Sequence, residues 1–179
     1  MKILIFNFFK TKHIQRSIFF FLILFTSINL SAQTKFTETF NNVKRGLSEN
    51  DAAKTTQGTS GITYTRGPGT GIHKVANKDI ALLIKTRKHI AAYIEVPLPK
   101  GVKNLEFEYS RPYDYKEGKT LGFTVTINGK DYKIETAEVQ QKKIAKFDKL
   151  NIKEATTLRI THGGSNVGFI IDNLKWKTY

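Results

Sequence analysis

The sequence predicts an all-β fold, a two-sheet antiparallel β-sandwich of the jelly-roll type that follows an N-terminal signal peptide. From Thr34 onward, short stretches of alternating apolar and polar residues are separated by turn residues, which is typical of strands. No long stretch of the same region shows the apolar repeat of a core helix. About ten short strands of this kind pack as two sheets with a core between them.

Residues 1–32 have the composition of a secretory signal peptide. They carry four cations and no acidic residue, the cations being Lys2, Lys10, Lys12 and Arg16. The apolar run 18–30 has about 13 residues, whereas a membrane-spanning helix needs roughly 20, so cleavage before Gln33 is favoured. An uncleaved signal anchor is the alternative, because Leu30 is not the small residue expected before a cleavage site.

Residues 33–179 are long enough for one domain with its own core. The whole chain has a formal net charge of +14, and loss of the four signal-peptide cations leaves +10. The chain has no cysteine, which excludes disulfides, cysteine zinc sites and cysteine nucleophiles. We therefore expect a basic, secreted or periplasmic domain with no transmembrane segment in its mature form.

The alternation defines the individual strands, and turn residues separate them. The candidate strands are residues 35–40, 61–66, 80–85, 90–96, 103–110, 121–127, 131–135, 144–147, 157–161 and 168–177. Residues 41–61 and 67–71 are rich in Asn, Ser, Thr and Gly and are expected to be surface loops.

The clearest local signal is the pair Asn128-Gly129. Asn-Gly accommodates the two positive φ angles of a two-residue type I′ hairpin, and this turn fixes the strand register. Val125 is then opposite Tyr132, and Phe123 is opposite Ile134. One face of the hairpin is apolar and the other polar, as expected for a sheet that covers a core.

Two carboxylates fall on faces that should be buried. Glu38 shares its face with Phe36 and Phe40 in the first strand, and Asp172 shares its face with Trp176 in the last strand. A buried carboxylate must be paired, hydrogen-bonded or bound to a cation.

One structural Ca²⁺ held by Glu38, Asp172 and Asp79 would explain both residues, since calcium takes six to eight oxygen ligands. The alternatives are an ion pair with Arg45 or a lysine, capture by backbone N–H groups, or a bulge that turns the carboxylate to solvent.

The first and last strands, residues 36–40 and 170–176, resemble those of jelly-roll modules in the carbohydrate-binding, galactose-binding-like superfamily of secreted bacterial proteins. The strand 105–109 and the hairpin 123–129 fit the same pattern. The resemblance implies a non-catalytic glycan-binding module. It also implies a structural calcium, because an acidic residue in the first strand and an Asp in the last commonly hold one in that family.

Tyrosine and arginine supply the candidate ligand-binding residues. A sugar ring presents C–H bonds on its faces and hydroxyl groups around its edge, so its site needs aromatic rings beside polar groups. The loop 110–118 contains two tyrosines and an arginine, and a second short segment adds one of each: the candidates are Arg111, Tyr113, Tyr115, Tyr64 and Arg66. The alternative is that these tyrosines only pack the loop onto the sandwich.

Charge supports a second candidate function. Lysines cluster at residues 142–153, and Lys85, Arg87 and Lys88 form another basic group, so a polyanion such as nucleic acid or an anionic glycan could bind non-specifically. A protein partner is a further alternative.

An enzyme is not expected from this sequence. The chain has no Gly-x-Ser-x-Gly or phosphate-loop motif, and the histidines after residue 32 do not have metal-ligand spacing.

Overall fold

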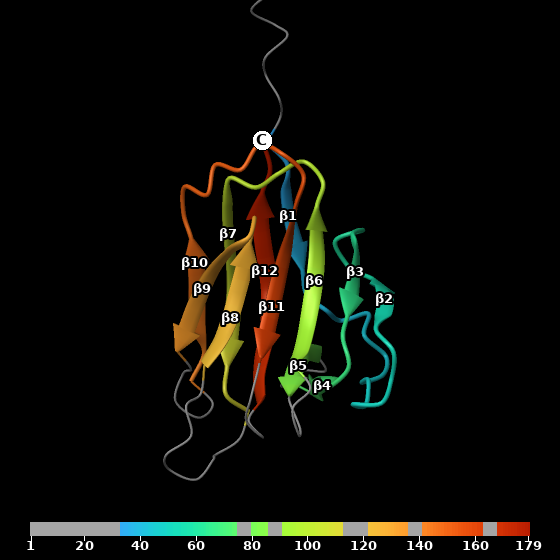
Figure 1. Ribbon diagram of the computed structural model, residues 1–179. Coiled ribbons are helices and arrows are strands. Elements are labelled where there is room, and N and C mark those ends of the chain that lie inside the picture. Colours follow the sequence, from blue (N-terminus) through green and yellow to red (C-terminus); the bar gives the residue numbers. More distant parts are fainter. Residues whose placement is uncertain (1–32, 75–79, 86–90, 113–121, 136–140, 163–167) are drawn as a thin grey trace, which may run out of the picture. The chain divides into compact units, whose positions relative to one another are not determined.

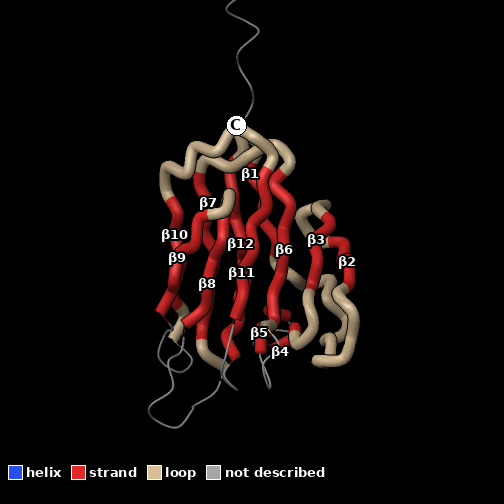
Figure 2. Tube along the Cα trace, in the orientation of Figure 1, coloured by secondary structure: helices blue, strands red, loops and turns tan. Residues whose placement is uncertain are grey.

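The computed structural model describes residues 33–74, 80–85, 91–112, 122–135, 141–162 and 168–179. These residues form twelve strands in two facing sheets, as Figures 1 and 2 show, and all strand pairs are antiparallel. The predicted all-β sandwich is therefore confirmed. Within the described residues, no helix could cross a membrane. The predicted signal peptide, residues 1–32, lies outside them.

The first sheet, sheet A, has the order β10-β7-β12-β5-β4, and β1 pairs with β12 beside β5. Its strands are β1 (Lys35–Glu38), β4 (Thr70–Lys74), β5 (Ile80–Lys85), β7 (Asn104–Ser110), β10 (Lys143–Phe147) and β12 (Gly168–Lys177). The first and last strands of the domain are thus hydrogen-bonded neighbours, with Phe36 opposite Trp176.

The second sheet, sheet B, has the order β2-β3-β6-β11-β8-β9. Its strands are β2 (Lys54–Gln57), β3 (Thr63–Arg66), β6 (Ala92–Leu98), β8 (Gly122–Ile127), β9 (Lys130–Glu135) and β11 (Thr156–His162). Asn128 and Gly129 have φ angles of 50° and 73°, as a type I′ turn requires. Val125 is opposite Tyr132, so the register predicted for this hairpin is confirmed.

The core lies between the sheets and is rich in aromatic residues. Phe123 of sheet B stacks on Phe169 of sheet A, with ring centroids 4.1 Å apart, and meets Tyr109 edge to face at 5.2 Å. Phe107, which lies on β7 like Tyr109, packs against Phe123 with ring centroids 6.0 Å apart. Alternation places these rings inward because neighbouring residues of a strand point to opposite faces.

Two strands were not predicted from the sequence. β2 falls within residues 41–61, which were expected to be a loop, and β4 begins in the expected loop 67–71 and continues to Lys74. Both are edge strands with few apolar residues, KTTQ and TGIHK. An edge strand needs hydrogen bonds from only one neighbour and little burial, so the alternating pattern is weak there.

A β-bulge interrupts β12 between Asp172 and Lys175, and Asn173 has a φ of 48°. The extra residue shifts the alternation of the strand by one, so odd-numbered side chains point to the core before the bulge and even-numbered ones after it. Before the bulge, Phe169 and Ile171 belong to the core cluster; after it, Leu174 and Trp176 do. Asp172 therefore does not share a face with Trp176, which corrects the strict alternation assumed from the sequence.

Candidate ligand-binding site

A hollow of about 520 Å³ lies on the outer face of sheet A, across β4, β5, β12 and β7. We call it the central groove. Its buried apolar lining comes from Ala81, Pro112 and Ile170. Its polar lining includes His73, Glu108, Ser110, Arg111, Lys142 and Asp172. The volume falls in the range typical of small-ligand sites.

Strand register places these side chains on one face. Ile170 of β12 stands opposite Ser110 of β7, and the next outward residue, Asp172, stands opposite Glu108. Directly paired residues of neighbouring strands point to the same side of a sheet. The bulge after Asp172 thus lets one strand contribute a carboxylate to the groove and a tryptophan to the core.

The carboxylate of Glu108 is held by two side chains. Lys142 Nζ lies 2.7 Å from Glu108 Oε2, and Asn173 Nδ2 donates to the same oxygen at 3.0 Å. Partial burial raises the pKa of Glu108. The hydrogen bonds from Lys142 and Asn173 and the charges of Lys142 and Lys175 outweigh this, so the pKa lies below its usual value.

We expect the substitution Lys142→Gln to raise the pKa of Glu108 toward the ordinary glutamate value. The lowered pKa means that the pair stabilises the fold above the usual carboxyl pKa and that this contribution is lost as the pH falls through the lowered value. Carboxyl-carbon NMR titration measures the shift. The matched control is Lys146→Gln, which removes a lysine whose ion pair is with Asp148. An unchanged Glu108 titration in the Lys142 variant would contradict this assignment.

Of the three predicted ligand-binding residues that the structure describes, one lies in the central groove. Arg111 lines it at the end of β7. Tyr113 and Tyr115 fall outside the described residues. Tyr64 and Arg66 lie on β3 of sheet B and do not come near the groove lining.

Tyr64 and Arg66 have structural positions instead. Tyr64 is only 2% exposed and meets Phe40 edge to face at 5.5 Å, so its ring is part of the core and offers no face to a sugar. Burial and the nearby charge of Glu38 raise the pKa of Tyr64. Arg66 donates to Thr56 Oγ1 at 2.9 Å and to the carbonyl oxygen of Arg45 at 2.8 Å. Arg66 therefore fastens β2 and the preceding loop to β3.

Glu38, predicted as a metal ligand, is 1% exposed and accepts four hydrogen bonds. Oε1 accepts from the backbone N–H of Phe40 at 2.7 Å and from Thr59 Oγ1 at 2.9 Å. Oε2 accepts from the backbone N–H and the hydroxyl of Ser60, at 3.0 and 2.9 Å. Hydrogen-bond donors therefore surround this carboxylate. Of the alternatives to calcium given above, capture by backbone N–H groups is the one that fits Glu38.

Asp172 and Glu38 do not converge on one ion. Glu38 points into the sandwich, whereas Asp172 lines the groove on the outer face of the same sheet. In the described part of the chain, no three acidic or histidine side chains form a group that could hold a metal. Asp79 lies outside that part. The residue set proposed for calcium therefore does not fit one site, and calcium binding stays a prediction that Ca²⁺ titration of EDTA-treated protein tests.

Sequence reasoning missed a second groove on sheet A. This hollow of about 370 Å³ crosses β1, β12, β7 and β10, and we call it the lysine groove. Its charged lining is Lys35, Lys146, Lys175, Lys177, Glu106 and Asp148. The sequence could not indicate it, because the groove exists only once the first and last strands are paired.

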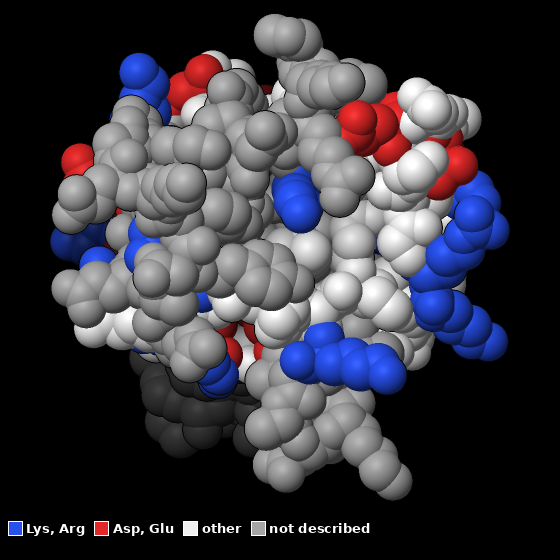
Figure 3. All heavy atoms as spheres, turned by 90° about the horizontal axis from the view of Figure 1, so that it is seen from below, with Lys and Arg blue, Asp and Glu red and all other residues white. Residues whose placement is uncertain are grey.

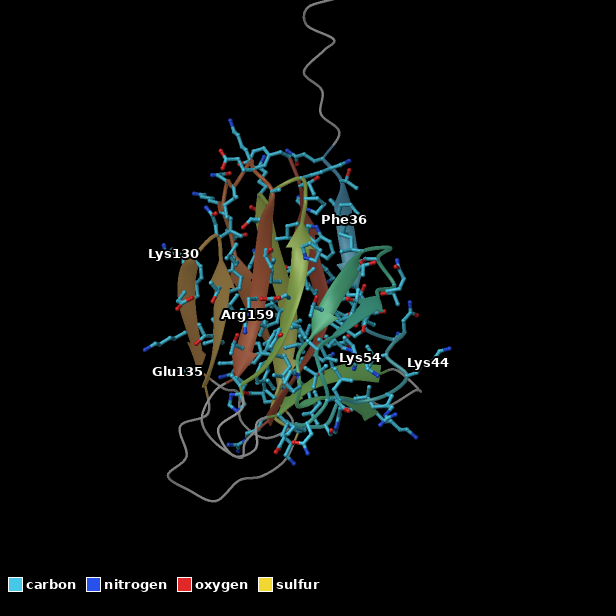
Figure 4. The ribbon with its side chains drawn as sticks, turned by 45° about the vertical axis from the view of Figure 1, so that its right-hand side comes forward. Phe36, Lys44, Lys54, Lys130, Glu135 and Arg159 are labelled. Atoms are coloured by element: carbon cyan, nitrogen blue, oxygen red, sulfur yellow. The ribbon has the colours of Figure 1, made fainter. Side chains whose placement is uncertain are left out.

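Arg159, labelled in Figure 4, is a cation held by several contacts on the outer face of sheet B. Its guanidinium carbon lies 4.0 Å from the centroid of the Tyr93 ring. The same group contacts Glu95 Oε1 at 2.5 Å and donates to Thr161 Oγ1 at 3.2 Å. These neighbours on the same face already contact the guanidinium of Arg159. The face around Arg159 is therefore a weaker candidate for ligand binding than the grooves of sheet A.

Comparison with known proteins gives structural neighbours only. No protein-family model matches the chain, and no curated protein matches its sequence. The fold is similar to the K2 cleaved adhesin domain of Lys-gingipain, with a TM-score of 0.52 and 11% identity over 80% of this chain and 99% of that one.

Carbohydrate-active proteins also appear among the neighbours. A family 11 carbohydrate-binding module from Clostridium thermocellum, solved with a mixed-linked tetrasaccharide, has a TM-score of 0.48 and 14% identity over 82% of this chain and 96% of that one. A family two carbohydrate esterase from Cellvibrio japonicus has a TM-score of 0.46 and 9% identity over 82% of this chain but only 34% of that one. At these identities the likeness concerns the fold alone, which is the β-sandwich predicted from the sequence.

Proposed function

We propose that this domain is a secreted, non-catalytic module that binds a glycan in the central groove of sheet A. The observation that carries the proposal is the composition of that groove, which combines a buried apolar lining with a surrounding set of charged and hydrogen-bonding side chains. The part of the proposal that the domain is secreted rests on the signal-peptide composition of residues 1–32.

The groove suits the two chemical faces of a sugar. Ile170 is 7% exposed and lies among polar neighbours, so it gives the C–H face of a ring an apolar contact. Arg111 and Asp172 supply planar polar groups that can contact adjacent hydroxyls. A carboxylate accepts hydrogen bonds from sugar hydroxyls, and a guanidinium donates to their oxygens.

Glu108, an acidic residue of the central groove, is not suited to act as a general acid. Glu108 has a lowered pKa and two side-chain partners, so it stays ionised and cannot donate a proton as a general acid near neutral pH. Asp172 Oδ1 also has a partner, because it accepts the backbone N–H of Asn173 at 2.7 Å.

The test is affinity electrophoresis and calorimetry on a panel of neutral and acidic polysaccharides, with wild-type and Arg111→Ala proteins. We expect at least one glycan to bind wild type, and Arg111→Ala to weaken binding about tenfold or more, since a hydrogen bond to a charged group contributes about 1.5–3 kcal/mol and 1.4 kcal/mol is about tenfold. The control is Lys133→Ala, which removes a cation from the exposed face of β9.

Two outcomes oppose the proposal. The proposal would be contradicted if the wild-type protein bound no glycan, or if the Arg111→Ala and Lys133→Ala variants bound a glycan with equal affinity. Binding that disappears entirely as salt rises, for every acidic polymer including DNA, would instead support the alternative of a non-specific basic protein. Capture of a protein partner with an unoccupied groove would support the remaining alternative.

A further inference from the structure

The lysine groove contains two cations that face each other across a strand pair. Lys35 of β1 is the direct antiparallel partner of Lys177 in β12, and both side chains point to the outer face of sheet A. Like charges placed directly opposite on neighbouring strands destabilise a sheet. The fold therefore keeps an unfavourable contact at this position.

The neighbouring row of the same groove shows how such charges are usually balanced. Lys175 stands opposite Glu106, with their charged atoms 3.6 Å apart, and Lys146 pairs with Asp148 at 3.3 Å. Among the described residues, no carboxylate forms an ion pair with Lys35 or Lys177. The charges of Lys175 and Lys146 are thus balanced by carboxylates, whereas Lys35 and Lys177 keep two positive charges side by side.

Other groups beside the two lysines can also donate hydrogen bonds. Lys177 stands opposite Asn104, whose side-chain oxygen accepts the backbone N–H of Lys149 at 3.1 Å. The amide nitrogen of Asn104 is then left as a donor. The hydroxyl of Thr37 lines the same groove. Two ammonium groups, an amide and a hydroxyl form a set suited to the oxygens of an anion.

Phe36 and Trp176 are among the residues that line the groove, but strand alternation turns their rings toward the core side of sheet A. Phe36 and Trp176 stack on each other with centroids 5.0 Å apart and pack toward the core, with Trp176 only 2% exposed. Single-stranded nucleic acid binds through base stacking on exposed aromatic rings in addition to charge. Because these two rings are stacked on each other and turned toward the core, the groove offers mainly charge and hydrogen bonds, which favours an acidic polysaccharide over nucleic acid.

We infer that the lysine groove binds the anionic groups of an acidic polysaccharide, either the carboxylates of uronic acids or sulfate esters, through Lys35 and Lys177. The inference rests on the proposed glycan-binding function and adds the charge class of the ligand. A polymer long enough to cross sheet A could occupy both grooves, since β7 and β12 line each of them.

The experiment compares the double variant Lys35→Gln/Lys177→Gln with a control of equal charge, Lys44→Gln/Lys54→Gln. Figure 4 shows Lys44 and Lys54 well away from Phe36 on β1. This control is needed because basic residues also gather elsewhere, as Figure 3 shows along one side of the molecule seen from below. The probes are polygalacturonate, dextran sulfate, a neutral galactan and duplex DNA, each at low and high salt.

We expect the groove variant to lose about tenfold in affinity for polygalacturonate or dextran sulfate, with a weaker salt dependence, while the control variant stays close to wild type. The polymer whose affinity falls in the groove variant identifies the anionic group, a carboxylate for polygalacturonate and a sulfate ester for dextran sulfate. Thermal melting should not fall, and should rise slightly, because a repulsive contact is removed. A lower melting temperature would indicate a structural role and overturn the inference.

The remaining outcomes are also decisive. Equal losses in both variants, or a response with DNA alone, would mean non-specific charge attraction and would refute the site. Binding of the neutral galactan without binding of either acidic polymer would leave the proposed function intact and remove this inference. Binding of no polysaccharide at all would remove both.

Discussion

The Glu38→Gln protein is expected to lose about 3 kcal/mol or more of its free energy of unfolding. Four donors meet the Glu38 carboxylate inside the sandwich, and two of them are backbone N–H groups that cannot turn away. In glutamine, an NH₂ group takes the place of one carboxylate oxygen. At least one of the four donors then loses its acceptor and faces the NH₂ group, which is itself a donor. An unsatisfied buried donor costs about 1–3 kcal/mol, and a hydrogen bond to a charged group contributes about 1.5–3 kcal/mol.

Urea unfolding monitored by circular dichroism measures this loss. The matched control is Glu106→Gln, which changes the same side chain on the outer face of sheet A, where Lys175 contacts it at 3.6 Å and both groups are partly exposed. A surface ion pair of this kind contributes roughly 0–1 kcal/mol. Thr59 and Ser60 lie in the turn between β2 and β3. If the two variants unfold at the same urea concentration, the hydrogen bonds from these residues to Glu38 do not stabilise the fold.

A second substitution examines the same contact from the other side. Gly58 packs so closely against Glu38 that a Cβ atom at this position would overlap Oε2 and approach the carbonyl oxygen of Ile62. The turn therefore requires glycine for close approach to the carboxylate, and Gly58→Ala should shift stability in the same direction as Glu38→Gln.

The Phe123→Ala protein is expected to unfold with a free energy lower by about 3–5 kcal/mol. Phe123 is 3% exposed and is the side chain through which β8 contacts the aromatic rings of sheet A. Its removal leaves a cavity bordered by Phe169, Tyr109 and Phe107, and rings held on two strands cannot collapse into it. Large-to-small substitution of a buried Phe costs this amount in other cores.

Thermal and urea unfolding of Phe123→Ala and Phe123→Leu, beside Ile144→Ala, give the comparison. Leucine keeps much of the volume and should cost less than alanine. Ile144 is 61% exposed on edge strand β10, so its truncation should change stability by less than about 0.5 kcal/mol. A loss at Phe123 no larger than at Ile144 would mean that the aromatic cluster does not couple the two sheets.

Strand positions could be predicted wherever burial produces alternation. The β8–β9 hairpin was predicted in full because its turn and its apolar face depend only on neighbouring residues. β2 and β4 were missed because edge strands need little burial. The reversal of facing at Asp172 was missed because it depends on one residue, Asn173, taking a positive φ.

The site was harder to predict than the fold because it depends on contacts between distant segments. Arg111 was identified from its local composition, and it lines the central groove. Lys35 and Lys177 are separated by almost the entire domain, and only the β1–β12 pairing brings them together. For Glu38, the sequence indicated a carboxylate that needs a partner, but the partners come from a turn some twenty residues away.

The pairing of β1 with β12 also determines how the domain responds to tension. The two strands run antiparallel, and the pair closes with the N–H of Thr178 donating to the carbonyl oxygen of Thr34 at 3.0 Å. Force applied to the chain on either side of this closure pulls on adjacent strand ends. Such a load opens cross-strand hydrogen bonds one after another, whereas a shearing load would have to break them together. A domain held by both ends would therefore be peeled apart from the strand pair that also forms the lysine groove.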